Sequence, residues 1–329
     1  YLAFVKSINF VILGDYQIIT ELGKKGTTSD ISIYDKKTLD TIYTWTAPVG
    51  FPEKIQPLMQ GVNMAEYAIL NIARLDRYLG EQIIALDSVG FTDGYILHSY
   101  EVDEEKLKML IKNTSISVFK ILDNIDQLKR EIAVLEPKSL ELQESNRNNK
   151  SVVIPIDHAF DVKGIGTVVL GVLKQGTIKV YDKLKLMPSG RDIVIKSIQM
   201  HDDPVQESKS PARVGLAIKG VTNEEISRGD ILCSSVNNVM NVATPGNLLS
   251  AHFKKNSYYQ SDILENQTYM ASVGLQVKPI KIKRNENSND SVIRIIPDKS
   301  IVYIPGQTFA VLKPDNQGIR IIGQGTLLG

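Results

Sequence analysis

The chain has 329 residues, of which 43% are hydrophobic and 23% are charged, and its formal net charge is +1. That length allows two or three domains with separate cores, and the near-zero charge excludes a uniformly basic or acidic chain. No apolar run reaches the roughly 18 residues of a membrane-spanning helix, so we expect no membrane partner. Cys233 is the single cysteine, which excludes an internal disulfide and favours a cytoplasmic protein without a metal site.

Through about residue 136, apolar runs of strand length alternate with amphipathic runs of helix length. The predicted strands cover residues 8–13, 41–46, 67–72 and 94–98, and the predicted helices cover residues 53–63, 80–89, 104–112 and 124–135. Continuous apolar strands with helical crossovers between them are typical of a parallel sheet covered on both faces. Residues 1–140 are therefore predicted to form an α/β domain.

Beyond this domain the pattern changes from helical to strand periodicity. Residues 141–150 are polar and poor in aromatic side chains, as is typical of a linker. From residue 151 to 237, apolar and polar residues alternate and glycines fall where strands must turn or bulge, which predicts a small antiparallel β-barrel. Residues 238–329 lack helical periodicity and contain β-rich runs such as 269–277 and 291–296. We therefore expect a second β-barrel there.

One segment of the predicted first barrel has a distinctive sequence. It reads FDVKGIGTVVLGVLKQG over residues 160–176, and it is followed by Asp182, by SIQMH at 197–201 and by Arg-Gly-Asp at 228–230. This spacing resembles the second domain of the translational GTPases, the EF-Tu and SelB family. The resemblance implies a role in protein synthesis.

The α/β domain carries a second resemblance. LGKKGTTSDI at residues 22–31 and FPEKIQPL at residues 51–58 resemble the GTPase domain of archaeal SelB-like factors, including those linked to pyrrolysine incorporation. Together with the barrels, the resemblance covers nearly the whole chain. It implies a P-loop-GTPase-like α/β domain followed by two antiparallel β-barrels.

The resemblance also identifies where a guanine nucleotide should bind. A phosphate loop has the pattern G-x-x-x-x-G-K-[ST], in which backbone amides and the lysine surround the phosphates and the hydroxyl holds magnesium. Gly14 matches the first glycine, but Ile19, Thr20 and Glu21 replace the second glycine, the lysine and the hydroxyl residue. An acidic side chain at a helix start repels polyphosphate. The sequence therefore predicts a damaged phosphate loop.

Two further nucleotide motifs of the family also depart from their patterns. D-x-x-G-H supplies a magnesium-linked aspartate and a histidine that orients water, but the matching segment has Thr46 and Phe51 at these places. HSYE at residues 98–101 stands where N-K-x-D reads guanine in the family. We therefore predict a pseudo-GTPase without catalytic residues or a cofactor, in which GTP and Mg²⁺ bind only if the degenerate site still functions. The vestigial nucleotide-binding positions are Gly14, Thr20, Thr46 and Gly50.

In the family, the second domain also holds the aminoacyl end of tRNA. The matching positions are Gln199, Met200, His201 and Arg213. An imidazole can stack on a terminal base, and an arginine can pair with phosphate or ribose oxygens. A barrel rim without a ligand is the alternative explanation of these residues. The first 150 residues contain 17 basic and 21 acidic residues and the remainder contains 21 and 16, so the second half is the more favourable place for a polyanion.

These observations lead to one main hypothesis and two alternatives. The main hypothesis is an elongation-factor-like protein that binds tRNA or the ribosome without GTP hydrolysis, as a monomer and without DNA as a partner. The first alternative is an active GTPase that delivers a specialised aminoacyl-tRNA by means of an unusual phosphate loop. The second is a protein-binding scaffold, which would show no salt-dependent tRNA affinity.

Overall fold

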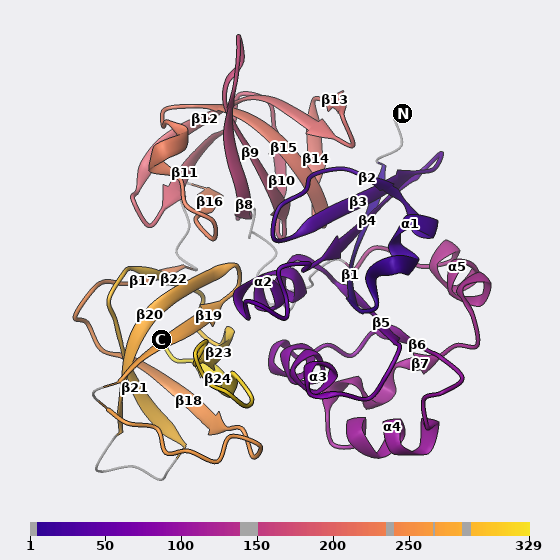
Figure 1. Ribbon diagram of the computed structural model, residues 1–329. Helices are drawn as coiled ribbons and strands as arrows, with labels where there is room; N and C mark the ends of the chain where they lie inside the picture. Colours follow the sequence, from indigo (N-terminus) through magenta and orange to yellow (C-terminus); the bar gives the residue numbers. More distant parts are fainter. Residues whose placement is uncertain (1–4, 139–150, 235–239, 266, 285–290) are drawn as a thin grey trace. The chain divides into compact units, whose positions relative to one another are not determined.

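The structure is a computed structural model that describes residues 5–138, 151–234, 240–265, 267–284 and 291–329 (Figure 1). Its contacts divide the chain into two compact units. Unit 1 comprises Tyr1–Asn9, Asp35–Thr44 and Glu136–Val239, and unit 2 comprises Phe10–Tyr34, Trp45–Leu135 and Met240–Gly329. The linker expected at 141–150 and the boundary expected at 237 lie outside the described residues, so the proposed domain boundaries stay predictions.

The N-terminal part of the chain forms a β-sheet with the strand order β2-β3-β4-β1-β5-β6-β7. Its strands are β1 (Lys6–Gly14), β2 (Lys24–Lys25), β3 (Ser32–Lys37), β4 (Thr41–Ala47), β5 (Tyr67–Ile72), β6 (Gly94–His98) and β7 (Lys120–Ile121). Strands β1, β5, β6 and β7 pair in parallel, which requires crossover connections between them. The four predicted strands are all present, whereas β3 was not expected because its outer half is polar.

Helices lie between these strands and after β7. They are α1 (Ile19–Leu22), α2 (Gln56–Met64), α3 (Arg77–Val89), α4 (Glu104–Ile111) and α5 (Ile125–Ala133), with the short 3₁₀ helices η1 (Tyr16–Ile18) and η2 (Ser115–Val118). Asp76, Asp103 and Asn124 accept hydrogen bonds from first-turn amides and so fix the starts of α3, α4 and α5. The four predicted helices correspond to α2 through α5, with ends that differ by at most three residues.

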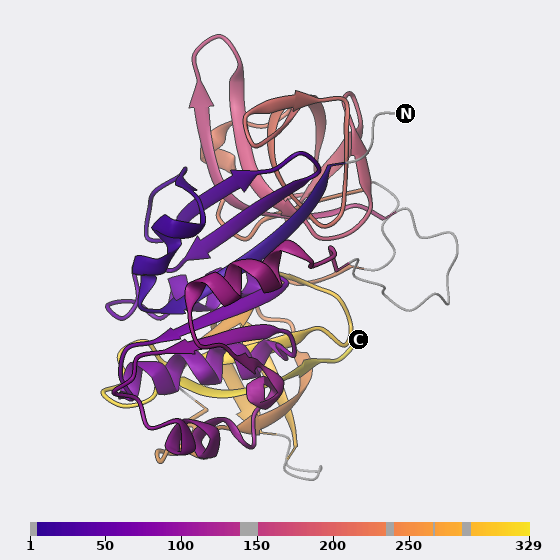
Figure 2. The same ribbon diagram turned by 90° about the vertical axis from the view of Figure 1, so that its right-hand side faces the viewer.

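The first barrel contains β8 (Val153–Val162), β9 (Gly166–Leu173), β10 (Thr177–Lys179), β11 (Lys183–Met187), β12 (Arg191–Met200), β13 (Asp203–Val205), β14 (Glu207–Lys209), β15 (Ala212–Lys219) and β16 (Ile231–Ser234), with η3 (Asn223–Glu225) before β16. The antiparallel order β11-β16-β8-β9-β15-β12 closes on itself because β11 also pairs with β12. Strands β8 and β9 extend beyond the barrel as a long hairpin arm (Figures 1 and 2). Gly171 lets these two strands approach closely, since a Cβ there would lie 2.6 Å from the Pro155 carbonyl oxygen.

The second barrel contains β17 (Asn241–Ala243), β18 (Leu249–Lys255), β19 (Thr268–Val273), β20 (Gln276–Arg284), β21 (Val292–Pro297), β22 (Ile301–Tyr303), β23 (Thr308–Leu312) and β24 (Ile321–Leu327). It is closed in the order β18-β21-β20-β19-β23-β24. The apolar run predicted at 269–277 is divided between β19 and β20, because Gly274 turns the chain with a φ of 55°. An α/β domain followed by two antiparallel barrels is thus confirmed.

Within unit 2, the α/β sheet and the second barrel share one hydrophobic core. Val11 of β1 and Ile83 of α3 belong to the same buried cluster as Leu312 of β23 and Ile321 of β24. Burial of such aliphatic side chains contributes about 1.5 to 3 kcal/mol each. The edge of the second barrel is therefore held against α3 by the same forces that hold the sheet together.

Candidate functional site

The end of β1, where the sequence predicts the vestigial phosphate loop, is hydrogen-bonded to β5. Gly14 has a φ of 84°, and a Cβ there would lie 2.0 Å from the Asn71 carbonyl oxygen. The Asp15 amide donates to that oxygen over 2.8 Å, and the Asn71 side-chain amide donates to the Asp15 carbonyl oxygen over 3.0 Å. Gly14 therefore permits a close approach between two parallel strands.

The turn that follows uses its amides internally. The Asp15 carboxylate accepts from the Gln17 amide over 2.9 Å, and the Ile19 amide donates back to the carbonyl oxygens of Tyr16 and Gln17. Thr20 is exposed on α1, and its hydroxyl donates to the Gln17 carbonyl oxygen over 2.9 Å. The amides of Asp15, Gln17 and Ile19 consequently already have acceptors within the chain.

Two other predicted nucleotide positions serve as packing residues in this structure. Thr46 is 1% exposed within β4. The Gly50 amide donates to the Asp30 carbonyl oxygen over 2.8 Å, and a Cβ on Gly50 would lie 2.9 Å from Asp30 Cβ. Phe51 is buried, with its ring edge-on to Tyr78 at a centroid distance of 6.0 Å.

A cavity of about 390 Å³ lies beside Gly14. Its polar lining consists of Asp15, Tyr16, Arg74, Asp76, Tyr78 and Gln82, whereas Thr20, Thr46 and Gly50 are not part of it. The Arg74 guanidinium donates to the Asp76 carboxylate over 2.9 Å, so the lining holds two carboxylates and one paired cation. Burial raises the pKa of Tyr16, and nearby Glu53 raises it further, so this hydroxyl stays protonated and donates to the Pro48 carbonyl oxygen.

At the end of β6, where the family recognises guanine, the side chains of His98 and Ser99 contact other residues of this chain. His98 Nδ1 lies 3.0 Å from the Ser99 carbonyl oxygen, and His98 Nε2 lies 3.5 Å from the Glu104 carboxylate. The Ser99 hydroxyl donates to the Ala73 carbonyl oxygen. Neither a lysine that could cover a base nor an aspartate that could pair with guanine occurs in this four-residue segment.

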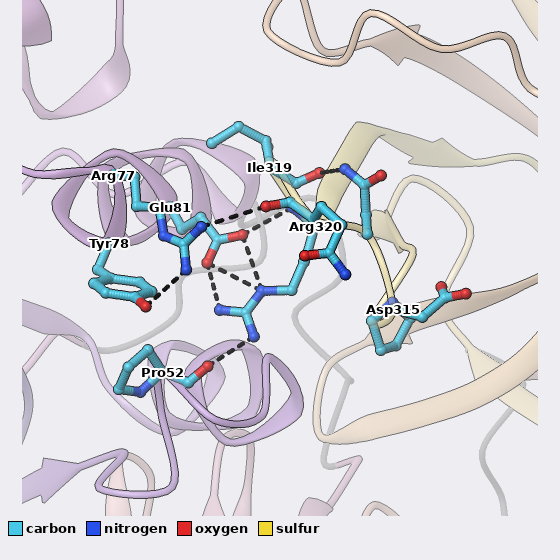
Figure 3. A pocket seen from close by; sticks show the side chains of 11 residues that line it. Pro52, Arg77, Tyr78, Glu81, Asp315, Ile319 and Arg320 are labelled. Carbon is cyan, nitrogen blue, oxygen red and sulfur yellow. Dashed lines mark hydrogen bonds and ion pairs between the residues drawn. The ribbon is translucent and has the colours of Figure 1, made fainter.

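A buried ion pair that the sequence did not predict joins α3 to the start of β24 (Figure 3). Arg320 Nη2 lies 2.5 Å from Glu81 Oε2, and the Arg320 backbone amide donates to Glu81 Oε1 over 2.8 Å. Arg320 Nη1 also donates to the Pro52 carbonyl oxygen, and the guanidinium lies 5.4 Å from the Phe51 ring centroid. The side chains of Arg320 and Glu81 are only 11% and 3% exposed. They line a cavity of about 420 Å³ with Arg77, Tyr78 and Asp315.

In the first barrel, the structure separates the predicted tRNA residues into different environments. Gln199 is exposed on β12, whereas Met200 is 7% exposed and belongs to the barrel core. His201 occupies the turn between β12 and β13 with a φ of 49°, and its Nδ1 lies 2.6 Å from Asp35 Oδ1. Burial raises the pKa of Asp35, although the neighbouring His201 opposes that change.

Arg213 forms an ion pair with a different carboxylate, that of Asp157. Its two terminal nitrogens donate to the two Asp157 oxygens over 2.7 and 2.8 Å, and Asp157 is almost fully buried. His158 Nδ1 lies 2.5 Å from the same carboxylate. Burial alone would raise the pKa of Asp157, but pairing with Arg213 and His158 outweighs burial and lowers it. His158 is thus a member of this network.

Within the described ranges, no three or more side chains of His, Cys, Asp or Glu are arranged to hold a metal ion. None of the helices that the structure describes is long and apolar enough to cross a membrane.

The chain is similar to known proteins over most of its length. Residues 166–233 match the family described as Elongation factor Tu domain 2. The uncharacterized protein MJ0325 of Methanocaldococcus jannaschii is 35% identical over 307 residues, which is 93% of this chain and 94% of that protein. The selenocysteine-specific elongation factor of the same organism is 30% identical over 65% of this chain, and this chain spans about half (49%) of its length.

Solved structures support the same assignment of fold. The translation elongation factor SelB of Methanococcus maripaludis, in complex with the GTP analogue GppNHp, superposes with a TM-score of 0.80 at 22% identity. The superposition covers 100% of this chain and 80% of that factor. The chain therefore belongs to the translational GTPase-like family of elongation factors that includes EF-Tu and SelB, in agreement with the prediction from its sequence.

Proposed function

We propose that this protein is an elongation factor of the SelB and EF-Tu type that binds tRNA or the ribosome without hydrolysing GTP. One observation carries the proposal. The amides of Asp15, Gln17 and Ile19 are consumed by hydrogen bonds within the chain, at the place where a phosphate loop must offer free amides. A triphosphate would have to displace these bonds before it could dock.

The charges around that position also disfavour a nucleotide. Phosphoryl transfer depends on cations and a magnesium ion that neutralise charge developing on the phosphates. The cavity beside Gly14 instead presents Asp15 and Asp76, and its single guanidinium, Arg74, is already paired with Asp76. The residues present therefore do not fit a magnesium-bound nucleoside triphosphate.

The residues that hold magnesium and orient the attacking water in the family are also replaced in this chain. Thr46 carries no carboxylate to hold magnesium through its water shell, and it is buried within β4. Phe51 cannot orient a water molecule because it has no hydrogen-bonding group, and its ring is packed against Tyr78. The α/β domain would then act as a fixed frame, with the Glu81 to Arg320 ion pair joining it to the second barrel.

The tRNA contact in this proposal depends on Gln199 and His201. Both lie on or directly after β12, and both side chains are at least partly exposed. His201 would exchange its contact with Asp35 for a terminal base, since imidazole rings stack on unpaired bases. Arg213 would support the barrel through Asp157 instead of contacting RNA directly.

The nucleotide half of the proposal is tested by titration with a fluorescent guanine nucleotide in the presence and absence of magnesium. We expect no saturable binding at nucleotide concentrations that saturate a SelB protein measured alongside. Micromolar, magnesium-dependent binding, with hydrolysis stimulated by ribosomes, would refute this half and favour the active GTPase.

The RNA half is tested by fluorescence anisotropy with labelled aminoacylated and deacylated tRNA. We expect His201→Ala to weaken binding of the aminoacylated tRNA severalfold, with Lys183→Ala, an exposed change on the neighbouring strand β11, as the matched control. If neither tRNA binds, or if the affinity does not depend on salt, the protein-binding scaffold becomes the better explanation.

A further inference from the structure

The cavity beside Gly14 has the size and the mixed lining of a small-molecule site, although its charges do not suit a nucleotide. Its volume is about 390 Å³, and the last residues of the parallel strands β1 and β5, Gly14 and Ile72, both line it. Small molecules commonly bind at this carboxyl edge of an open α/β sheet. The apolar part of the lining consists of Phe51, Pro52, Ile72, Ala73 and Leu79. A ligand must therefore carry an apolar part as well as polar groups.

Gln82 places a polar group in this cavity that the fold does not use. It lies on the second turn of α3, lines the cavity and is only 5% exposed. None of the hydrogen bonds within the described part of the chain involves its side-chain amide. An amide that is buried without a partner is destabilising, so native structures rarely retain one without a reason. The open amide of Gln82 indicates a ligand that carries a hydrogen-bonding group.

Asp15 contributes an unpaired negative charge to the same lining. Its carboxylate accepts from the Gln17 amide over 2.9 Å, and no cation among the described residues pairs with it. The other carboxylate is fully used, because Asp76 accepts from the Leu79 amide with one oxygen and from Arg74 with the other. The Arg74 side chain is 78% exposed. The cavity therefore presents one carboxylate more than its cations neutralise.

The surroundings of the cavity favour a cation of some length. Burial raises the pKa of Tyr16, which also lines the cavity, and the negative charge of Glu53 raises it further, so a second acid acts on this region. The lining follows α3 from Asp76 to Gln82, and these residues are about 9 Å apart along the helix axis at about 1.5 Å per residue. The cavity can therefore hold an extended chain of several carbons.

We propose that the cavity beside Gly14 binds a short aliphatic amine with an ammonium group at one end and a hydrogen-bond donor at the other. The ammonium group pairs with Asp15, the methylene chain lies against Phe51 and Leu79, and the second donor bonds to the amide oxygen of Gln82. A diamine and an amino alcohol share this chemistry. A lysine side chain of a partner protein is disfavoured, because it carries no second donor. The proposed function does not include such a ligand.

Isothermal titration calorimetry on the full chain with putrescine, aminobutanol, butylamine and butanediol tests the proposal. We expect saturable binding at one site per chain for putrescine and aminobutanol, and the tighter of the two identifies the ligand as a diamine or an amino alcohol. Butylamine lacks the second donor and should bind about tenfold more weakly, since one hydrogen bond accounts for roughly that factor. Butanediol lacks the ammonium group and should not bind. Equal affinity for butylamine, or measurable binding of butanediol, would overturn the proposal.

Two substitutions assign the two ends of the ligand. Asp15→Asn keeps an oxygen that accepts from the Gln17 amide but removes the charge, so it should weaken binding of both amines by about tenfold or more. Gln82→Met removes the amide at similar volume, so it should reduce the affinity for aminobutanol to that for butylamine and leave butylamine unaffected. Unchanged amine affinities in both variants would place the ligand elsewhere and refute the assignment.

Melting temperatures and a matched control separate a ligand contact from a structural role. Because the Gln82 amide has no partner in the fold, Gln82→Met should leave the melting temperature unchanged or raise it, whereas a purely structural glutamine would lower it. Asp103→Asn is the control for Asp15→Asn, since Asp103 also accepts from nearby backbone amides, at the start of α4, and does not line the cavity. An equal loss of amine affinity in Asp103→Asn would show a general charge effect and overturn the cavity ligand.

This proposal and the proposed function can fail separately. The amine titration contains neither nucleotide nor RNA, so an absence of saturable amine binding overturns the cavity ligand and leaves the proposed RNA binding unaffected. Magnesium-dependent displacement of bound putrescine by GTP would refute the nucleotide half of the proposed function, while the amine site would stand.

Discussion

Removing the guanidinium of Arg320 should destabilise unit 2 far more than removing the whole ion pair. Arg320→Ala leaves the carboxylate of Glu81, which is only 3% exposed, without the partner that donates to both of its oxygens. An unpaired charge in such a site costs about 3 to 5 kcal/mol. For a cooperative unit of this size, each kcal/mol lowers the melting temperature by about 2 to 4 °C, so we expect a decrease of about 6 to 20 °C.

The matched control replaces both partners. Glu81→Leu with Arg320→Met removes the two charges together and retains most of the side-chain volume, and such exchanges are often neutral or stabilising. Differential scanning calorimetry on the two variants, and on Glu81→Leu and Arg320→Met alone, completes a double-mutant cycle. A loss of under 1 kcal/mol in Arg320→Ala, or a double variant less stable than Arg320→Ala, would refute the reasoning.

Two further predictions concern the first barrel and the end of β1. Asp157→Asn should destabilise unit 1 by about 3 kcal/mol at neutral pH, because it leaves the buried Arg213 guanidinium without a counter-charge. Since pairing lowers the pKa of Asp157 in the folded state, the stability it contributes is present above its unfolded pKa of about 4 and disappears as the pH falls through the lowered value. Urea unfolding between pH 2 and 7 should show this acid-dependent loss in the unmodified protein and a smaller one in Asp157→Asn, and equal pH profiles would contradict the assignment. Gly14→Ala should cost about 2 kcal/mol or more, because its φ of 84° and the 2.0 Å approach to the Asn71 carbonyl oxygen leave no room for a methyl group. Thermal unfolding compares it with Gly80→Ala, where the added Cβ meets nothing within 4 Å, and similar behaviour of the two variants would show that β1 and β5 can separate without cost.

The elements that could be predicted are those whose pattern is set by local burial. Strands β5 and β6 occupy the predicted residues because both are apolar nearly throughout, and the barrels were recognised from alternation and glycine placement. Strand β3 was missed because Ser32–Lys37 is buried only at its first two residues and ends in charged, exposed ones. Its place in the sheet is decided by pairing with neighbours, which periodicity does not report.

The candidate site was less predictable because its contacts join residues distant in the sequence. Arg213 was singled out as a tRNA ligand, but its partner Asp157 lies 56 residues away. Nothing in the sequence around Glu81 indicates that Arg320, 239 residues later, will approach it. The neighbouring Asp157 and His158 offered a weak signal, since adjacent acidic and imidazole groups on a buried strand require partners. Residue types alone could not say whether an arginine faces solvent or a buried carboxylate.

The double hydrogen bond between Asp15 and Asn71 has a consequence for the evolutionary history of this chain. Exchanging Thr20 for lysine, or Thr46 for aspartate, would leave both hydrogen bonds in place, because neither residue takes part in them. If phosphate binding has been lost, as the proposed function requires, its recovery would need the turn after β1 to lengthen and Asn71 to release the Asp15 carbonyl oxygen. A change at only one of these places would break hydrogen bonds of the folded chain without freeing the whole turn, so under the proposed function the loss of the nucleotide would be difficult to reverse.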